Sequence, residues 1–465
     1  MTKVFGVVVA AVMLATSNRA TRVEANESIM RDGDYEVGAA SVDDRQPVQV
    51  SQLLAAAQGA PKPVCALAAS ALRNWGWGDN DAPATPLGVS VVYRREDDVG
   101  RMPDSTINLL LSSLSSEDPC VREIAVRLVA RRNNPVVTSA LVTKLADNAV
   151  ATREVAALGL GLSDSRDAIQ PLIRTLRDGA ETVRANAAWA LGSIEAGEAL
   201  GQLMDLFRDN STMVRRASVV AVGHLDSTRA APTLIRVLRS DADPGVRRVA
   251  AWALGDLESR EAVEPLSAAL DGDSDARVRE MCAWALGNIE SRSATNALTK
   301  AARGDSDDRV RETAVWALGN VEDVNAVGAL SDIASSDKNT RVRGTAAWAL
   351  GQVLDEGRRA PAGLIKLLGD ESADTRLKAA WALGQIGDSS ALGAIHSALK
   401  VEKNQEVNRA LIRALMKSGE RSAEALTELI DSKDPRVREA AIRGLAGRSS
   451  FNPWPWPWPR PRPFP

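Results

Sequence analysis

Tryptophan is the residue of this chain whose type and spacing most suggest a binding chemistry. Six tryptophans fall in one column of a repeated pattern, and from Trp252 onward they follow one another at steps of 32, 32, 32 and 33 residues. The face of the indole ring binds proline rings and guanidinium groups well. The column is therefore the candidate partner-binding surface, and its members are Trp189, Trp252, Trp284, Trp316, Trp348 and Trp381.

The residue types that usually carry catalysis or metal binding are scarce. The chain has only two histidines, His224 and His396, and neither is followed by Glu. There is no HExxH metalloprotease motif, no GxSxG nucleophile motif and no Walker phosphate loop. No pair of its three cysteines has zinc-finger spacing. The sequence thus predicts no catalytic residue, no metal and no cofactor, and we expect a protein that is not an enzyme.

The charge balance also narrows the class of partner. Across 465 residues the formal net charge is -3 and the sequence pI is about 5.8. A nucleic-acid-binding protein usually carries a basic patch, and this balance gives no sign of one. We therefore expect a protein or peptide partner and no nucleic acid.

The tryptophan column belongs to a repeat of two short helices. Besides the six tryptophans, the column is filled at residues 127, 158, 220, 413 and 443, which makes about eleven units between residues 104 and 447. In one unit the apolar spacing predicts helices over 262–270 and 276–289, with Asp275 as the N-cap of the second. Neither helix alone can bury its apolar stripe, so neighbouring units must stack. The pattern predicts an all-α fold, an α-solenoid.

Helical geometry places the tryptophan away from the core. With 100° of rotation per residue, Trp284 lies about 240° from Val278. The apolar positions of the same helix fall within about 80° of Val278; they are Cys282, Ala285, Leu286 and Ile289. Trp284 therefore lies outside the buried stripe.

The recurring pattern VRxxAAxALGxI resembles the HEAT-like repeats of the bilin-lyase type over about three quarters of the chain. The resemblance implies a right-handed superhelix whose concave surface is lined by the tryptophan column. It also implies that a column of arginines and the Asp residues of the nearby turns, such as Asp275 and Asp307, tie adjacent repeats together. Anion binding is the alternative role for these arginines, which are Arg184, Arg215, Arg247, Arg279, Arg311 and Arg343.

Two interpretations of the tryptophans remain open at this point. Stacked helices lie about 8–10 Å apart, and three residues of a polyproline II strand rise about 9.3 Å, so an exposed column matches an extended Pro- or Arg-rich peptide. Alternatively, each indole packs flat on the alanines of its neighbours and fills space.

The N-terminal part carries the features of an exported protein. Lys3 followed by the apolar run 4–15 is typical of a signal peptide, with cleavage after about residue 25, and an uncleaved anchor is the alternative. Residues 26–103 are irregular, and we expect one capping helix pair among them. An oxidising compartment permits disulfides; Cys65 and Cys120 are candidates to pair, whereas Cys282 is expected to be a buried free thiol. We expect a secreted or periplasmic protein.

The C-terminal residues 448–465 contain FNPWPWPWPRPRPFP. Alternating prolines forbid a helix and favour an extended form. The stretch resembles Trp/Pro-rich antimicrobial peptides, which implies a modest membrane contact. It is expected to be unstructured, and it is also a candidate ligand for the concave face of its own or a neighbouring molecule.

Three functions follow from these observations. The first is an exported, non-enzymatic scaffold that binds a protein or extended peptide on its Trp-lined concave face. The second is a lyase-like enzyme or enzyme subunit, because bilin lyases share this repeat. The third is an envelope-associated protein whose tail contacts membranes.

Overall fold

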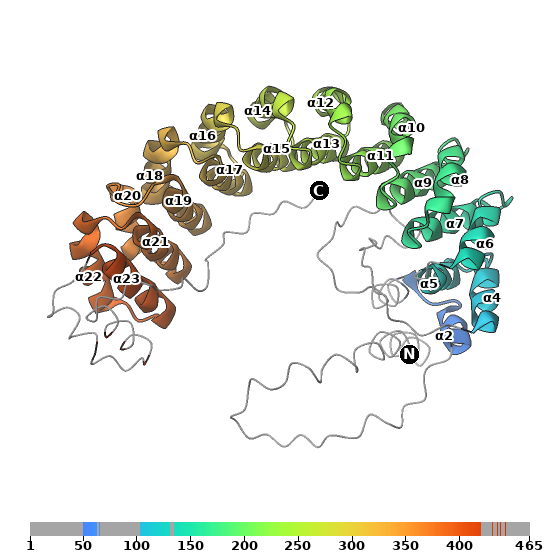
Figure 1. Cartoon of the computed structure of the whole chain (residues 1–465), viewed down its shortest axis with the longest axis horizontal. Coiled ribbons are helices and arrows are strands. Elements are labelled where there is room, and N and C mark those ends of the chain that lie inside the picture. The colour runs from blue at the N-terminus through green and yellow to red at the C-terminus, as the bar shows by residue number, and fades with distance from the viewer. Residues whose placement is uncertain are drawn as a thin grey trace, which may run out of the picture. The chain divides into compact units, whose positions relative to one another are not determined.

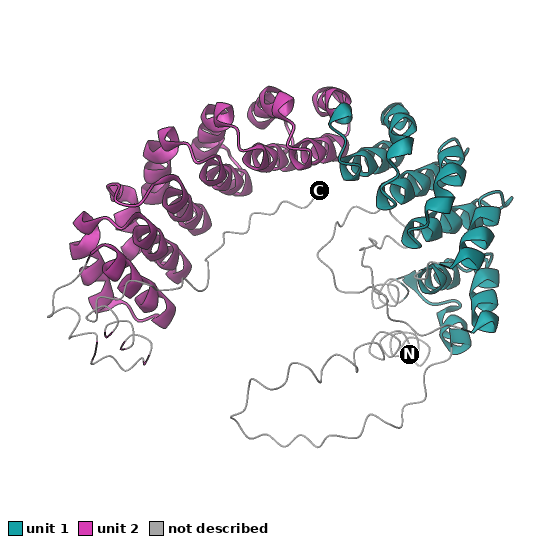
Figure 2. Cartoon of the chain, viewed as in Figure 1, with its two compact units in different colours: residues 1–230, 464–465 teal, residues 231–463 magenta. Residues whose placement is uncertain are grey.

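The computed structural model describes residues 50–62, 65, 103–130 and 134–419, and four single residues beyond them, 430, 435, 438 and 442. The chain divides into two compact units, with the division between Ala230 and Ala231 (Figure 2). Several predicted features lie outside the described residues: the signal segment, much of the irregular segment 26–103, most of the eleventh repeat and the C-terminal tail.

The first unit is a series of helix pairs preceded by one short helix (Figure 1). In each pair a shorter helix is followed by a longer one, and the longer helix carries the VRxxAAxALG pattern or a variant of it. The helices are α2 (Val50–Ala57), α4 (Asp104–Ser113), α5 (Pro119–Val129), α6 (Pro135–Lys144), α7 (Val150–Leu162), α8 (Ile169–Thr175), α9 (Glu181–Ser193), α10 (Leu200–Asp205) and α11 (Thr212–His224).

The second unit continues the same pattern with six further pairs among its described residues. Its helices are α12 (Ala231–Ser240), α13 (Pro244–Asp256), α14 (Val263–Gly272), α15 (Ala276–Ile289), α16 (Thr295–Gly304), α17 (Asp308–Val321), α18 (Val327–Ser336), α19 (Thr340–Val353), α20 (Ala362–Lys366), α21 (Ala373–Ile386), α22 (Leu392–Val401) and α23 (Gln405–Lys417).

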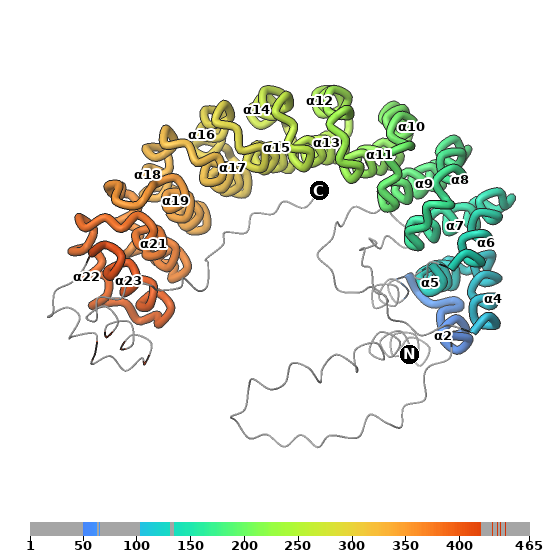
Figure 3. Tube along the Cα trace, in the orientation of Figure 1, coloured from blue at the N-terminus to red at the C-terminus, as the bar shows by residue number. Residues whose placement is uncertain are grey.

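The helices of the second unit form two layers. Consecutive odd-numbered helices from α13 to α23 contact one another, and so do consecutive even-numbered helices from α12 to α20. The Cα trace of this unit shows the same alternation (Figure 3). Short 3-10 turns such as Arg260–Ala262 and Arg292–Ala294 lead from the longer helix into the next pair. The all-α solenoid predicted from the repeat is confirmed.

The longer helices of the second unit begin at side-chain caps. The carboxylate of Asp275 accepts hydrogen bonds from the backbone N–H groups of Arg277 and Val278, at 2.8 and 3.4 Å, as the sequence predicted. Asp307 and Asn339 cap α17 and α19 in the same way. Each cap satisfies backbone donors that have no partner within the helix, and a cap of this kind contributes about 1 kcal/mol.

The buried stripe of the longer helix lies where the sequence predicted it. In α15 the side chains of Val278, Cys282, Ala285 and Leu286 are fully buried, and Ile289 is 6% exposed. Alanine has a small side chain, so its presence at the helix–helix contacts allows the backbones of neighbouring helices to approach closely.

One backbone feature of the repeat was not visible in the sequence. The sixth residue after the tryptophan column has a positive φ in most repeats, and this conformation favours glycine. Glycine occupies it in Gly387 (φ 65) and Gly419 (φ 91). Elsewhere it holds an exposed acidic residue with φ between 46 and 54: Asp164, Glu195, Asp226, Glu258, Glu290 and Glu322. The left-handed residue ends the long helix and redirects the chain into the next pair.

Of the helices that the structure describes, none has the length and apolarity required to cross a bilayer.

Candidate functional site

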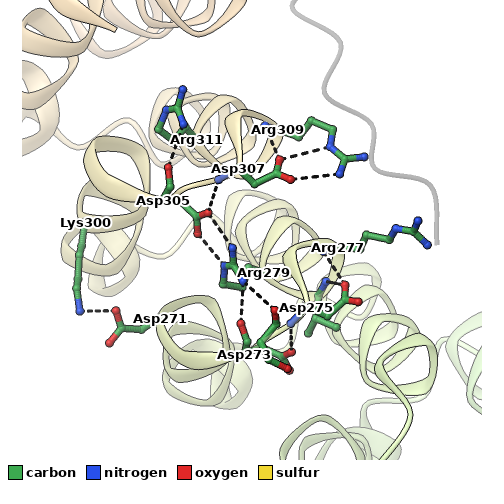
Figure 4. A network of polar contacts seen from close by, with 12 residues as sticks. Asp271, Asp273, Asp275, Arg277, Arg279, Lys300, Asp305, Asp307, Arg309 and Arg311 are labelled. Atoms are coloured by element: carbon green, nitrogen blue, oxygen red, sulfur yellow. Dashed lines mark hydrogen bonds and ion pairs between the residues drawn. The ribbon is translucent and has the colours of Figure 1, made fainter. Parts of the chain in front are cut away.

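An arginine near the start of most long helices joins neighbouring repeats. Nε of Arg279 donates to one carboxylate oxygen of Asp305 at 2.8 Å, and Nη2 donates to the other at 2.9 Å (Figure 4). Its Nη1 also donates to the backbone carbonyl of Asp273 at 2.9 Å. Asp305 in turn accepts from the backbone N–H of Asp307 at 2.9 Å. A single arginine thus fastens the turn of its own repeat to the turn of the next.

The same arrangement recurs in both units. Every one of these arginines is partly or fully buried and is paired through its planar guanidinium, which suits two-point binding of a carboxylate. The pairs are Arg153–Asp178 and Arg184–Asp209 in the first unit, and Arg247–Asp273, Arg279–Asp305, Arg311–Asp337, Arg343–Asp370 and Arg376–Glu402 in the second.

The tie between repeats implied by the family resemblance is therefore present, but one detail of it was wrong. Asp275 and Asp307 were expected to be the acidic partners of the arginines. They are instead helix caps, and the partners lie two residues earlier, at Asp273 and Asp305. The reason is geometric: the cap carboxylate must turn toward the first N–H groups of its own helix, so it points away from the previous repeat.

The pairing changes the ionisation of the acids. The hydrogen bond from Arg153 lowers the pKa of Asp178, against the opposing effect of burial. In the same way, the hydrogen bond from Arg376 lowers the pKa of Glu402. These carboxylates are committed to the packing of repeats, and they are not available as general acids or bases near neutral pH.

The tryptophan column differs in exposure from one repeat to the next. Trp189, Trp252 and Trp348 are buried, with 8%, 6% and 2% of their surface exposed. Trp284, Trp316 and Trp381 are partly exposed. The column is not uniformly open to solvent, so the six residues do not contribute equally to any binding surface.

Five tryptophans of the column pack against a glycine of the preceding repeat. A Cβ atom added to Gly287 would lie 2.8 Å from Cζ3 of Trp316 and 2.9 Å from the Cα atom of Ala317. Equivalent contacts join Gly161 to Trp189, Gly255 to Trp284, Gly319 to Trp348 and Gly351 to Trp381. The glycine of the ALG motif is therefore required, because the indole and the backbone of the next repeat leave no space for a side chain. One edge of each of these five indoles packs between repeats, as the second interpretation of the tryptophans predicted.

Two of the partly exposed tryptophans, Trp284 and Trp316, have polar side chains beside them on the same helix face. In α15, Glu280 precedes Trp284 by four residues and Asn288 follows it by four, so the three side chains lie in one stripe. In α17, Glu312, Trp316 and Asn320 repeat this stripe 32 residues later. Glu280, Trp284, Asn288, Trp316 and Asn320 are partly exposed, and Glu312 is 7% exposed.

The cysteines are also resolved by the structure. Cys65 and Cys120 form a disulfide with a Cα–Cα distance of 5.6 Å, which settles the pairing that the sequence left open. The bond ties the segment after α2 to the start of α5. Cys282 is a buried free thiol, as expected, and burial raises its pKa.

Over the part of the chain that the structure describes, no three His, Cys, Asp or Glu side chains come together in an arrangement that could hold a metal ion.

Comparison with known proteins identifies the repeat. A family model described as HEAT repeats matches the chain six times, at residues 107–184, 138–223, 172–254, 231–319, 295–362 and 361–446. No curated protein matches the sequence.

Solved structures give the same fold. A chain in the structure of Kap95p with RanGDP is 15% identical, with a TM-score of 0.54, over 86% of this chain and 61% of that chain. Escherichia coli YibA is 17% identical over 70% of this chain and 99% of that chain, with a TM-score of 0.40. Human deoxyhypusine hydroxylase is 22% identical over 54% of this chain and 96% of that chain, with a TM-score of 0.26.

The Kap95p match supports the solenoid architecture alone, and the other two similarities are too low to add to it. The narrower resemblance to bilin-lyase repeats stays a prediction, because the matching family model is the general one. The six matches together span residues 107–446, which is more than half of the chain, and the protein belongs to the HEAT-repeat family.

Proposed function

We propose that this protein is a non-enzymatic scaffold that binds an extended protein segment on the tryptophan face of α15, α17 and α21. A HEAT-repeat solenoid is an interaction scaffold in its general architecture. The observation that carries the finer proposal is the partial exposure of Trp284, Trp316 and Trp381, since indole rings are seldom left in contact with water without a reason.

The repeat spacing supports an extended ligand. Neighbouring helices of one layer lie about 8–10 Å apart, and three residues in polyproline II conformation rise about 9.3 Å. A peptide running across α15 and α17 would present equivalent side chains to successive repeats. Pro- and Arg-rich segments suit this face because proline rings and guanidinium groups both stack on indole.

The catalytic alternative has less support. The paired Arg and Asp side chains are fully used in joining repeats, and the chain contains two histidines only. The tail at 448–465 remains a candidate ligand on chemical grounds, as well as a candidate membrane contact.

Selection of peptides tests the proposed function. A library of random 12-residue peptides is displayed on phage and selected on the full chain, and we expect it to yield binders. These binders should bind the double variant Trp284→Leu with Trp316→Leu at least about tenfold more weakly, which corresponds to about 1.4 kcal/mol. Leucine keeps an apolar side chain against Gly255 and Gly287 but removes the indole face. Fluorescence anisotropy of labelled peptides measures the affinity.

Trp348→Leu is the matched control. It removes an indole from the same column at a position that is 2% exposed, so it should lower stability by about 2–4 kcal/mol and leave peptide affinity unchanged. Peptides that bind the double variant as tightly as the unmodified chain would contradict a binding role for these tryptophans, as would the failure of any peptide to be selected.

We also propose that the protein acts in an oxidising compartment, after export. The disulfide between Cys65 and Cys120 supports this, because such bonds persist outside the reducing cytosol. Protein recovered from its native source should begin near residue 26. When denatured without reductant, it should react with one alkylating group, at Cys282, and with three after reduction. Three reactive thiols before reduction would argue against the proposal.

A further inference from the structure

The two stripes on α15 and α17 differ from the rest of the tryptophan column. Among the helices that the structure describes, only these two combine a glutamate, a partly exposed tryptophan and an asparagine at four-residue intervals on one face. At the corresponding places α13 has Arg248 and Asp256, α19 has Gly344 and Gln352, and α21 has Leu377 and Gln385. The combination of carboxylate, indole and carboxamide groups is therefore confined to two adjacent repeats of the described structure.

Glu280 is the least satisfied carboxylate of this face. Within the described part of the chain its side chain makes no hydrogen bond or ion pair, although Arg309 and Arg248 lie near enough to influence it. Arg309 is held elsewhere, because its guanidinium bonds to the carboxylate of Asp307 at 3.3 and 3.4 Å. Burial raises the pKa of Glu280, with smaller contributions from Asp307 and Glu312 that act in the same direction. A half-buried carboxylate without a partner is costly unless a ligand supplies one.

Glu312 is paired, but its partner can be exchanged. Nη2 of Arg341 lies 2.6 Å from the carboxylate of Glu312, and 65% of the Arg341 side chain is exposed against 9% for Glu312. An ion pair with one solvent-exposed member contributes little to stability. A guanidinium from a partner could replace Arg341 and would gain contact with the face of Trp316 at the same time.

The asparagines offer a different kind of contact. In the described structure neither Asn288 nor Asn320 uses its side chain in a hydrogen bond. A carboxamide carries both donors and an acceptor, which match the N–H and C=O groups of an extended main chain. Two such amides on successive repeats would hold the peptide backbone beside the indoles, independently of the peptide's sequence.

We propose that Glu280, Trp284 and Asn288 with Glu312, Trp316 and Asn320 form a subsite for a basic side chain of an extended peptide. The carboxylates bind an arginine or lysine of the partner, the indoles cover its cationic group, and the amides bind the adjoining main chain. This inference rests on the proposed function and specifies its partner as a cationic, extended segment.

Peptides of matched length test the charge preference. Fluorescein-labelled (Pro-Pro-Arg)4 should bind the full chain about tenfold more tightly than (Pro-Pro-Gln)4 by anisotropy, because only the arginine can pair with the carboxylates and stack on indole. The double variant Glu280→Gln with Glu312→Gln removes the pairing but keeps the indoles, so it should remove most of that difference and leave binding of the glutamine peptide unchanged. Glu261→Gln, at an exposed glutamate of the same unit, is the matched control.

A second double variant tests the side-chain amides of Asn288 and Asn320. Asn288→Ala with Asn320→Ala should weaken the arginine and glutamine peptides by the same factor, since the main chain is common to both, whereas Asn296→Ala at an exposed site on α16 should weaken neither. Thermal unfolding at pH 7 checks the fold: Glu280→Gln should not lower Tm, because it removes a desolvated charge that lacks a partner.

Four results would overturn the inference. Three of them are equal affinity for the two peptides, no binding of either peptide, and no effect of the glutamate variants. The fourth is tighter binding of (Pro-Pro-Glu)4, which would assign the face to an acidic partner that binds through Arg277, Arg309 and Arg341. Peptides from the random library that depend on Trp284 and Trp316 but carry no basic residue would retain the proposed function while this inference fails. Loss of that tryptophan dependence would remove both.

Discussion

Replacement of Gly287 by alanine should destabilise the protein by about 2–3 kcal/mol, although alanine is the better helix former. The new methyl group would lie 2.8 Å from Cζ3 of Trp316 and 2.9 Å from the Cα atom of Ala317. The backbone of α17 cannot yield by changing a rotamer, so α15 and α17 must move apart and lose packing. Chemical denaturation gives the free energy of unfolding, and hydrogen exchange of the α15 and α17 amides locates the loss.

Gly384→Ala is the matched control for this prediction. Gly384 occupies the same place in its repeat, but the next repeat has Arg413 in the tryptophan column, and an added Cβ would lie 3.4 Å from the Cα atom of Ala414. This is an ordinary contact, so the helix propensity of alanine should dominate and stabilise the protein by up to about 1 kcal/mol. The same substitution is thus expected to have opposite signs at two equivalent positions. Stabilisation at both would show that the indole contact imposes no steric limit.

The second large effect concerns the arginine column. Arg311→Ala should cost about 3–5 kcal/mol, because it leaves the buried carboxylate of Asp337 without its ion-pair partner. The side chains of this pair are 6% and 9% exposed, with Nε of Arg311 at 2.9 Å from the carboxylate. The carbonyl of Asp305 also loses a hydrogen bond of 3.0 Å. Arg311→Lys should recover only part of the loss, since an ammonium group cannot contact the carboxylate and the carbonyl as a planar fork does.

Arg303→Ala serves as the control because it breaks an ion pair between the same two repeats at the surface. Arg303 lies 2.7 Å from Asp332, but the two side chains are 50% and 70% exposed, so the expected loss is below about 1 kcal/mol. Equal effects of the two alanine substitutions, measured by denaturation in the same buffer, would mean that the column does not hold the repeats together.

The site was only partly predictable from the sequence. The period of the tryptophan column placed Trp284 and Trp316 on one face of successive helices, because a helix advances by a constant angle per residue. The exposure of each indole could not be predicted, since it depends on the residues that the neighbouring repeat brings against it. Trp348 is 2% exposed and Trp316 is partly exposed, although both stand in a WALG sequence.

The glutamates and asparagines beside the tryptophans could not be recognised from the sequence, for a related reason. Their spacing of four residues is visible in the sequence at Glu280 and Asn288, but charged and amide residues on a helix are usually solvated and carry no signal by themselves. Only the structure distinguishes Glu280, which is half-buried without a partner, from Glu261, which is exposed.

The sequence by itself determined the repeat, its two-helix unit, the Asp275 cap and the buried stripe from Val278 to Ile289. These depend on interactions between residues close in the chain, which hydrophobic periodicity and capping preferences report directly. The tertiary structure alone decided that Cys65 meets Cys120, that Arg279 pairs with Asp305 and not with a cap, and that Trp316 rests on Gly287. Each of these joins residues more than 25 positions apart, and their meeting depends on how neighbouring repeats stack, which no local pattern encodes.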